Sequence, residues 1–116
     1  MAFEQWAVVV VPFPFTDRRA DRRRPALVVS RPEALGNGVG QSVLAMITSA
    51  AHSAWPLDVP LVDLASAGLP APSLVRMKLF TLDDRLVERQ VGALAAADAL
   101  AAAAALTRLF GFTTAV

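Results

Sequence analysis

Short apolar runs that end at proline or glycine make up most of this chain, and they predict short strands rather than long helices. The first run, residues 8–11, consists of valines and is followed by Pro12 and Pro14. Valine favours strands, and proline, which has no N–H to donate to a sheet, is confined to their ends and edges. Runs of similar character follow at residues 26–29, 42–48, 74–81 and 86–91. We therefore expect a mainly β fold, a small curled antiparallel sheet or open barrel.

One of these runs differs from the others. Residues 42–48 have apolar side chains on both faces, so this strand is expected to be covered on both sides.

The segments between the runs carry weaker signals. The glycine-rich residues 35–40 predict a turn, and the proline-containing residues 52–62 predict a short edge strand. Residues 64–72 are expected to be irregular. Residues 83–85, Asp-Asp-Arg, predict a hairpin turn between the last two strands.

An alanine-rich segment after residue 95 ends the strand pattern. Alanine has the highest helix propensity, Asp98 is a candidate N-cap, and Gly111 is a candidate stop. Leu100, Ala103 and Phe110 fall on one helical face. The sequence predicts one C-terminal α-helix packed on the sheet, and we expect residues 1–116 to form a single domain.

The composition excludes several classes of site. The chain has no cysteine and one histidine, which removes disulfides, thiol nucleophiles and multi-histidine metal centres. We expect neither a metal nor a cofactor. A membrane span needs about 20 predominantly apolar residues in a row, and none occurs here. Because no basic residue precedes the first apolar run, no secretory signal is expected either. These patterns predict a cytoplasmic protein.

Positive charge is concentrated in one loop. The formal net charge of the chain is +1, yet residues 17–24 contain five arginines and two aspartates, a local charge of +3. Such a loop can bind a phosphate backbone, although a soluble hairpin loop has the same composition.

An ordered series of motifs resembles a known family. These motifs are VVPFPFTD at 10–17, RPALVVS at 24–30, ITS at 47–49, PSLVR at 72–76, FTLD at 80–83 and VGAL at 91–94. In order and spacing the chain resembles the PemK/MazF-like toxins of type II toxin–antitoxin systems, over nearly its whole length. The resemblance implies one PemK/MazF-like domain with an SH3-like β-barrel and a C-terminal helix, assembled as a homodimer.

The resemblance also implies an activity. Members of this family are metal-independent endoribonucleases that cleave single-stranded RNA, often mRNA, at short sequences. A cognate antitoxin silences them, and the complex with the antitoxin binds DNA. Two other hypotheses remain open: a toxin of the same fold that poisons gyrase, and a non-catalytic member that only binds RNA or antitoxin.

Carried over residue by residue, the resemblance makes Arg24 and Thr48 the catalytic residues. Without it, the sequence favours interpreting Arg24 as a solvated loop arginine, and favours more strongly interpreting Thr48 as a hydroxyl that caps a strand end. Arg24 precedes one predicted strand and Thr48 ends the next, so both side chains could lie at the same rim of the sheet. The residues expected to bind RNA are Arg22, Arg23, Ser49, Arg76 and Lys78.

The expected chemistry uses the substrate's own nucleophile. Metal-free RNA cleavage proceeds by attack of the 2′-hydroxyl on the adjacent phosphate, which leaves a 2′,3′-cyclic phosphate and a 5′-hydroxyl. The protein must hold the phosphate in line, stabilise the developing charge and manage two proton transfers. The planar fork of a guanidinium, such as that of Arg24, matches phosphate oxygens, and the hydroxyl of Thr48 can donate to them.

Two positions depart from the family pattern. Lys78 stands where relatives can have an acid, so the sequence does not identify a proton acceptor. Trp6-Ala7 replaces a usual glycine and acid, and we interpret Trp6 as a core or interface aromatic before a base-stacking surface. His52 follows Thr48 by four residues. A lone histidine is more often a packing or turn residue, so the sequence gives it no catalytic role.

Overall fold

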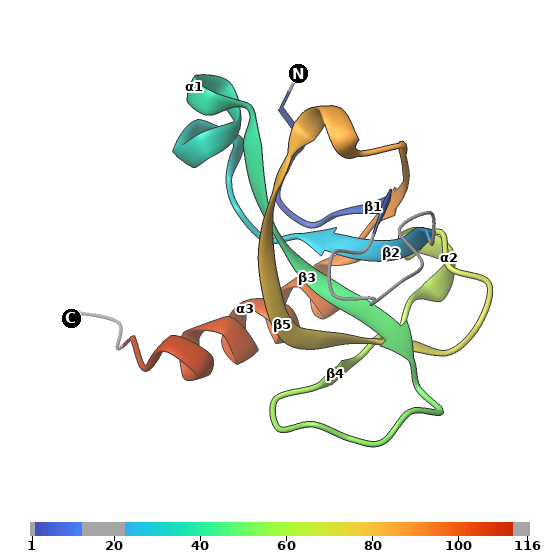
Figure 1. Cartoon of the computed structure of the whole chain (residues 1–116). Coiled ribbons are helices and arrows are strands. Elements are labelled where there is room, and N and C mark those ends of the chain that lie inside the picture. Colours follow the sequence, from blue (N-terminus) through green and yellow to red (C-terminus); the bar gives the residue numbers. More distant parts are fainter. Residues whose placement is uncertain (1, 13–22, 113–116) are drawn as a thin grey trace.

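The computed structural model describes residues 2–12 and 23–112, and its main feature is one curled sheet (Figure 1). Six strands form this sheet in the order β4-β5-β3-β2-β1-β6, and neighbouring strands are antiparallel. Their bounds are β1 Ala7–Pro12, β2 Arg23–Val28, β3 Gln41–Ser49, β4 Val59–Pro60, β5 Ser73–Asp83 and β6 Arg89–Ala93. With the helix α3, Ala96–Phe110, the architecture confirms the predicted β fold with a C-terminal helix.

Strand β3 is the centre of the sheet, because it pairs with both β2 and β5. Ala45 and Ile47 belong to a core between one face of the sheet and α3, whereas Leu44 belongs to a second core inside the curl. All three side chains are at most 1% exposed. The prediction of a strand covered on both sides is confirmed. Figure 1 shows β3 and β5 as long bent strands, which lets one sheet enclose the second core.

The helix α3 packs through small side chains. Ala102 and Ala105 are buried in the first core, and Gly111, at φ 72°, ends the helix as predicted. A left-handed residue at this position suits glycine because it has no Cβ. No helix in residues 2–12 and 23–112 has the length and apolar character needed to cross a membrane.

Asp98 is not the N-cap of α3. The cap position is Ala95, and Asp98 lies in the first turn of the helix. Its carboxylate is 2% exposed and accepts backbone N–H bonds from Val62 at 3.1 Å and from Asp63 at 2.9 Å. The sequence indicated a local cap, but the tertiary contact ties the helix to the segment after β4.

We expect Asp98→Ala to lower the free energy of unfolding by about 2 kcal/mol, because it removes the buried carboxylate that accepts hydrogen bonds from two backbone N–H groups. Urea denaturation measures this change. The exposed Glu33→Ala variant is the matched control and should stay within about 0.5 kcal/mol of wild type. Equal stability of the two variants would contradict the anchoring role of Asp98.

Strands β5 and β6 do not form the predicted hairpin. The chain leaves β5 through a 3₁₀ turn, η2 (Asp84–Leu86), and β6 then pairs with β1 at the far edge of the sheet. At the start of this turn the Asp83 carboxylate accepts the N–H of Arg85 at 2.9 Å. The capped turn separates the two strands, and the curl of the sheet brings the edge of β1 within reach of β6.

Three connecting segments also differ from expectation. Residues predicted as a glycine turn form a π-type turn, η1 (Pro32–Gly36), and a short helix, α1 (Asn37–Val39). Residues predicted as irregular contain α2 (Leu64–Ala67), capped by Asp63, whose carboxylate accepts the Ser66 N–H at 2.9 Å. Of the predicted edge strand 52–62, only the two residues of β4 pair with β5.

Candidate active site

Arg24 and Thr48 come together because β2 begins where β3 ends. In the antiparallel register Ala26 lies opposite Met46. Arg24 is two residues before Ala26, and Thr48 is two residues after Met46, so both side chains extend from the same face of the sheet. Both line a cleft of about 260 Å³. The structure thus brings the two expected catalytic residues to one site.

The cleft has two walls. One is formed by the ends of β2 and β3 and includes Ser49; the other is the proline-rich segment 69–73 that leads into β5. The N–H of Ala50 donates to the carbonyl of Pro72 at 3.1 Å and joins the two walls. Since proline restricts the backbone, the second wall is pre-formed.

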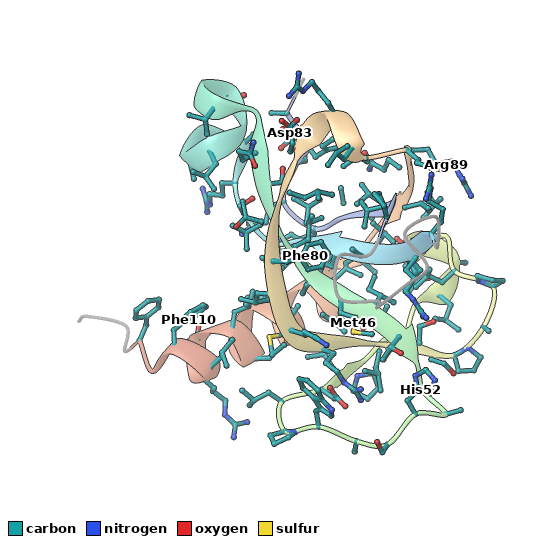
Figure 2. The ribbon with its side chains drawn as sticks, in the orientation of Figure 1. Met46, His52, Phe80, Asp83, Arg89 and Phe110 are labelled. Atoms are coloured by element: carbon teal, nitrogen blue, oxygen red, sulfur yellow. The ribbon has the colours of Figure 1, made fainter. Side chains whose placement is uncertain are left out.

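Thr48 has a side-chain partner that sequence analysis missed. The Thr48 side chain is buried, and its Oγ1 lies 2.7 Å from Nδ1 of His52. The chain reverses between them: the His52 N–H donates to the Ser49 carbonyl at 3.2 Å, and the Ala51 N–H donates to Ser49 Oγ at 3.1 Å. This turn returns the imidazole to the strand end, and Figure 2 shows His52 beside the end of β3.

Arg76 extends from β5 on the same face of the sheet, opposite Met46. It is 6% exposed, and its guanidinium donates to both carboxylate oxygens of Asp58, from Nε at 3.2 Å and from Nη2 at 3.0 Å. Nη2 also donates to the Ser53 carbonyl at 2.6 Å. The guanidinium lies 4.8 Å from the centre of the Trp55 ring. Arg76 therefore holds the 50–58 loop against the sheet.

Asp58 is the acceptor at the centre of this loop. Burial raises the pKa of its carboxyl, but the hydrogen bonds from Arg76 and from the Trp55 N–H, with the attraction of the guanidinium, outweigh burial and lower the pKa below its usual value of 3.8. Since the Asp58 side chain is only 9% exposed, the ion pair is a buried one. The loop that carries His52 is thus fixed by a buried charge pair.

The other expected RNA-binding residues lie at different places. Lys78 Nζ is 5.9 Å from the centre of the half-exposed Trp55 ring. Arg23 begins β2 and pairs with Glu88 just before β6. Arg22 lies outside the described residues. Trp6 is partly buried and packs against the first core, which agrees with its interpretation as a core aromatic.

In residues 2–12 and 23–112, no three His, Asp or Glu side chains gather in a way that could hold a metal ion. The cleft offers a guanidinium and hydroxyls, and the imidazole of His52 contacts one of these hydroxyls. These groups can bind a phosphate, donate hydrogen bonds to its oxygens and exchange a proton.

Comparison with known proteins identifies the family. A family model described as PemK-like, MazF-like toxin of type II toxin–antitoxin system matches residues 4–110. The chain belongs to this toxin family. The resemblance seen in the sequence motifs is confirmed. A comparison with curated protein sequences gives no match.

Solved structures agree with the PemK/MazF assignment. A Mycobacterium tuberculosis toxin, MazF-mt6, is 26% identical, with a TM-score of 0.71 over 93% of this chain and 99% of that one. A MazE–MazF structure from Deinococcus radiodurans is 22% identical, with a TM-score of 0.74 over 97% and 99% of the two chains. An endoribonuclease in complex with its cognate antitoxin, from a mycobacterial species, is 18% identical, with a TM-score of 0.76 over 98% and 100%. The last two share the fold of this chain.

Proposed function

We propose that this toxin-family member is a metal-independent endoribonuclease that cleaves single-stranded RNA at short sequences. The observation that supports the proposal is the convergence of Arg24 and Thr48 on one cleft. A solved structure of the same fold is an endoribonuclease in complex with its cognate antitoxin, which points to the same activity. The products would carry a 2′,3′-cyclic phosphate and a 5′-hydroxyl.

Arg24 acts on the scissile phosphate in this proposal. Negative charge builds on the phosphate oxygens as the 2′-oxygen attacks, and a guanidinium can donate to two oxygens at once. Thr48 Oγ1, beside it in the cleft, contacts the attacking oxygen or a phosphate oxygen. Neither residue needs to change charge for these tasks.

The remaining residues bind the rest of the RNA strand. Ser49 lines the cleft itself, whereas Arg23 and Lys78 lie to either side and can bind phosphates. Arg22 is proposed on the family resemblance alone. Arg76 contributes indirectly in this proposal, because its guanidinium is 6% exposed and already holds the loop residues Asp58 and Ser53.

We also propose a homodimer, on the family resemblance, and a cognate antitoxin as partner, as in the solved MazE–MazF complexes. Apolar surface remains for such contacts. Phe110 and Phe112, at the end of α3, are 55% and 69% exposed, and both line an apolar groove of about 360 Å³ between α3 and the sheet. An apolar segment of a partner chain would bury them.

The test is incubation of the purified protein with a long RNA in EDTA, followed by mapping of the fragment ends. We expect cleavage at a recurring short sequence, with 2′,3′-cyclic phosphate and 5′-hydroxyl ends, because no step needs a metal ion. Strict dependence on a divalent cation would contradict the mechanism. Growth arrest without RNA cleavage would favour a gyrase-poisoning toxin, and RNA binding without products would favour a non-catalytic member.

A further inference from the structure

Cleavage by the 2′-hydroxyl requires a group that takes its proton, and the cationic residues at the site do not suit this task. The guanidinium of Arg24 offers hydrogen-bond donors and no acceptor atom. Lysine side chains are likewise hydrogen-bond donors without an acceptor, so Lys78 does not supply the missing group. The carboxylate of Asp58 is held by Arg76 and the Trp55 N–H.

We propose that His52 accepts this proton through the hydroxyl of Thr48. The inference rests on the proposed ribonuclease function and adds a positioning residue to it. It is carried by the 2.7 Å contact between Thr48 Oγ1 and His52 Nδ1. Imidazole is the side chain that ordinarily exchanges a proton near neutral pH, and here it meets a hydroxyl of the cleft.

The surroundings of His52 fit this role. Its side chain is exposed, so a proton that reaches the ring can pass to water. Two hydrogen bonds fix the backbone around His52. The His52 N–H donates to the Ser49 carbonyl, and the carbonyl of the next residue, Ser53, accepts from Arg76. The imidazole is thus held against Thr48 by backbone contacts that do not depend on its own titration.

The proposed step moves two protons together. The 2′-hydroxyl proton moves to Thr48 Oγ1 while the Thr48 hydroxyl proton moves to His52 Nδ1. The bond from the 2′-oxygen to phosphorus forms, and the bond from phosphorus to the 5′-oxygen breaks. The leaving 5′-oxygen takes a proton from water, and the imidazolium returns its proton to water. Nδ1 must be unprotonated at the start, so the rate should fall when acid protonates the ring.

Three charged groups lie on the elements around the imidazole. Arg24 in β2 lines the same cleft as Thr48, and Arg76 in β5 donates to the carbonyl of the residue that follows His52. Asp58 lies in the same loop as His52 and is paired with Arg76.

The experiment compares wild type with His52→Gln in single-turnover cleavage between pH 5 and 8.5. Glutamine can keep the hydrogen bond to Thr48 but cannot titrate. We expect the variant to cleave about 100-fold more slowly at neutral pH, with unchanged affinity for a 2′-O-methylated RNA. The rise of the rate with pH in wild type should be absent from the variant. Ser53→Ala, a neighbour in the same loop that keeps its backbone carbonyl, is the control and should behave as wild type.

The single histidine of this chain allows an independent readout. The protein has one histidine Cε1–H signal in the NMR spectrum, so the pKa of the ring with the 2′-O-methylated RNA bound can be compared with the midpoint of the wild-type rate profile. Agreement supports the inference. Unchanged cleavage in His52→Gln, or a pH dependence that survives the substitution, overturns it while leaving the ribonuclease proposal intact. Absence of cleavage by wild type would overturn both.

Discussion

Arg24→Ala is expected to slow RNA cleavage about 1000-fold and to abolish growth arrest on expression. The guanidinium is the only fixed positive group at the cleft among the residues described there, which are Arg24, Pro25, Ile47, Thr48, Ser49 and residues 69–73. Its removal leaves the charge that develops on the phosphate without a pre-positioned cationic donor. The measurement is single-turnover cleavage of a defined RNA.

Two controls separate this effect from general loss of charge or fold. Arg24→Lys keeps the charge but loses the planar fork, so it should recover only part of the rate. Arg31→Ala removes an exposed arginine beyond the other end of β2 and should cleave as wild type. A folded Arg24→Ala protein with an undiminished rate would remove Arg24 from the mechanism.

Asp58→Ala should have the largest effect on stability, a loss of about 3–5 kcal/mol in the free energy of unfolding. The substitution leaves the guanidinium of Arg76 buried without its counter-charge, since both side chains are below 10% exposed. It also releases the Trp55 N–H, which donates to Asp58 at 2.8 Å. Urea denaturation at neutral pH measures the loss.

A double substitution tests whether the cost comes from the stranded charge. Arg76→Met with Asp58→Leu removes both charges, and we expect it to recover most of the stability that Asp58→Ala loses. If the double variant is no more stable than Asp58→Ala, the cost lies elsewhere than in the unpaired guanidinium.

The pH dependence of this pair has a definite sign. The folded-state pKa of Asp58 is lowered below its ordinary value of 3.8, so the folded protein holds the ionised form more strongly than the unfolded chain does. The stabilisation is therefore fully present above about pH 4 and is lost as the pH falls through the folded-state pKa. The difference in stability between wild type and Asp58→Ala should shrink in acid, and urea curves from pH 7 to pH 3 measure it.

The strands and the terminal helix were predictable because their signals are local. Four valines before Pro12 specify β1, and the alanines before Gly111 specify α3. The proximity of Arg24 and Thr48 was also within reach, because antiparallel neighbours bring the start of one strand beside the end of the other. The roles of these two residues came from the family resemblance, since an arginine beside a threonine is common in strand ends.

The pairing of β6 was not predictable from the sequence. A short polar turn such as 83–85 normally joins two paired strands. Here the sheet curls enough for β1 to offer its free edge, and the capped η2 turn directs β6 there. The same limit applies to Asp98, whose partners lie more than 30 residues earlier in the chain. Its local context suggested a cap, and only the docking of α3 shows what it binds.

The sequence alone determined which groups this protein has for chemistry: ten arginines, one lysine, one histidine and no cysteine, in a chain of short strands with one helix. The tertiary structure decided which of them meet. It places Arg76 in a buried pair with Asp58 across 18 residues, and it turns His52 back onto Thr48. Such contacts depend on how loops fold over a sheet, and side-chain identity does not encode that geometry locally. The histidine that the sequence left without a role is, in the structure, the partner of a residue in the cleft.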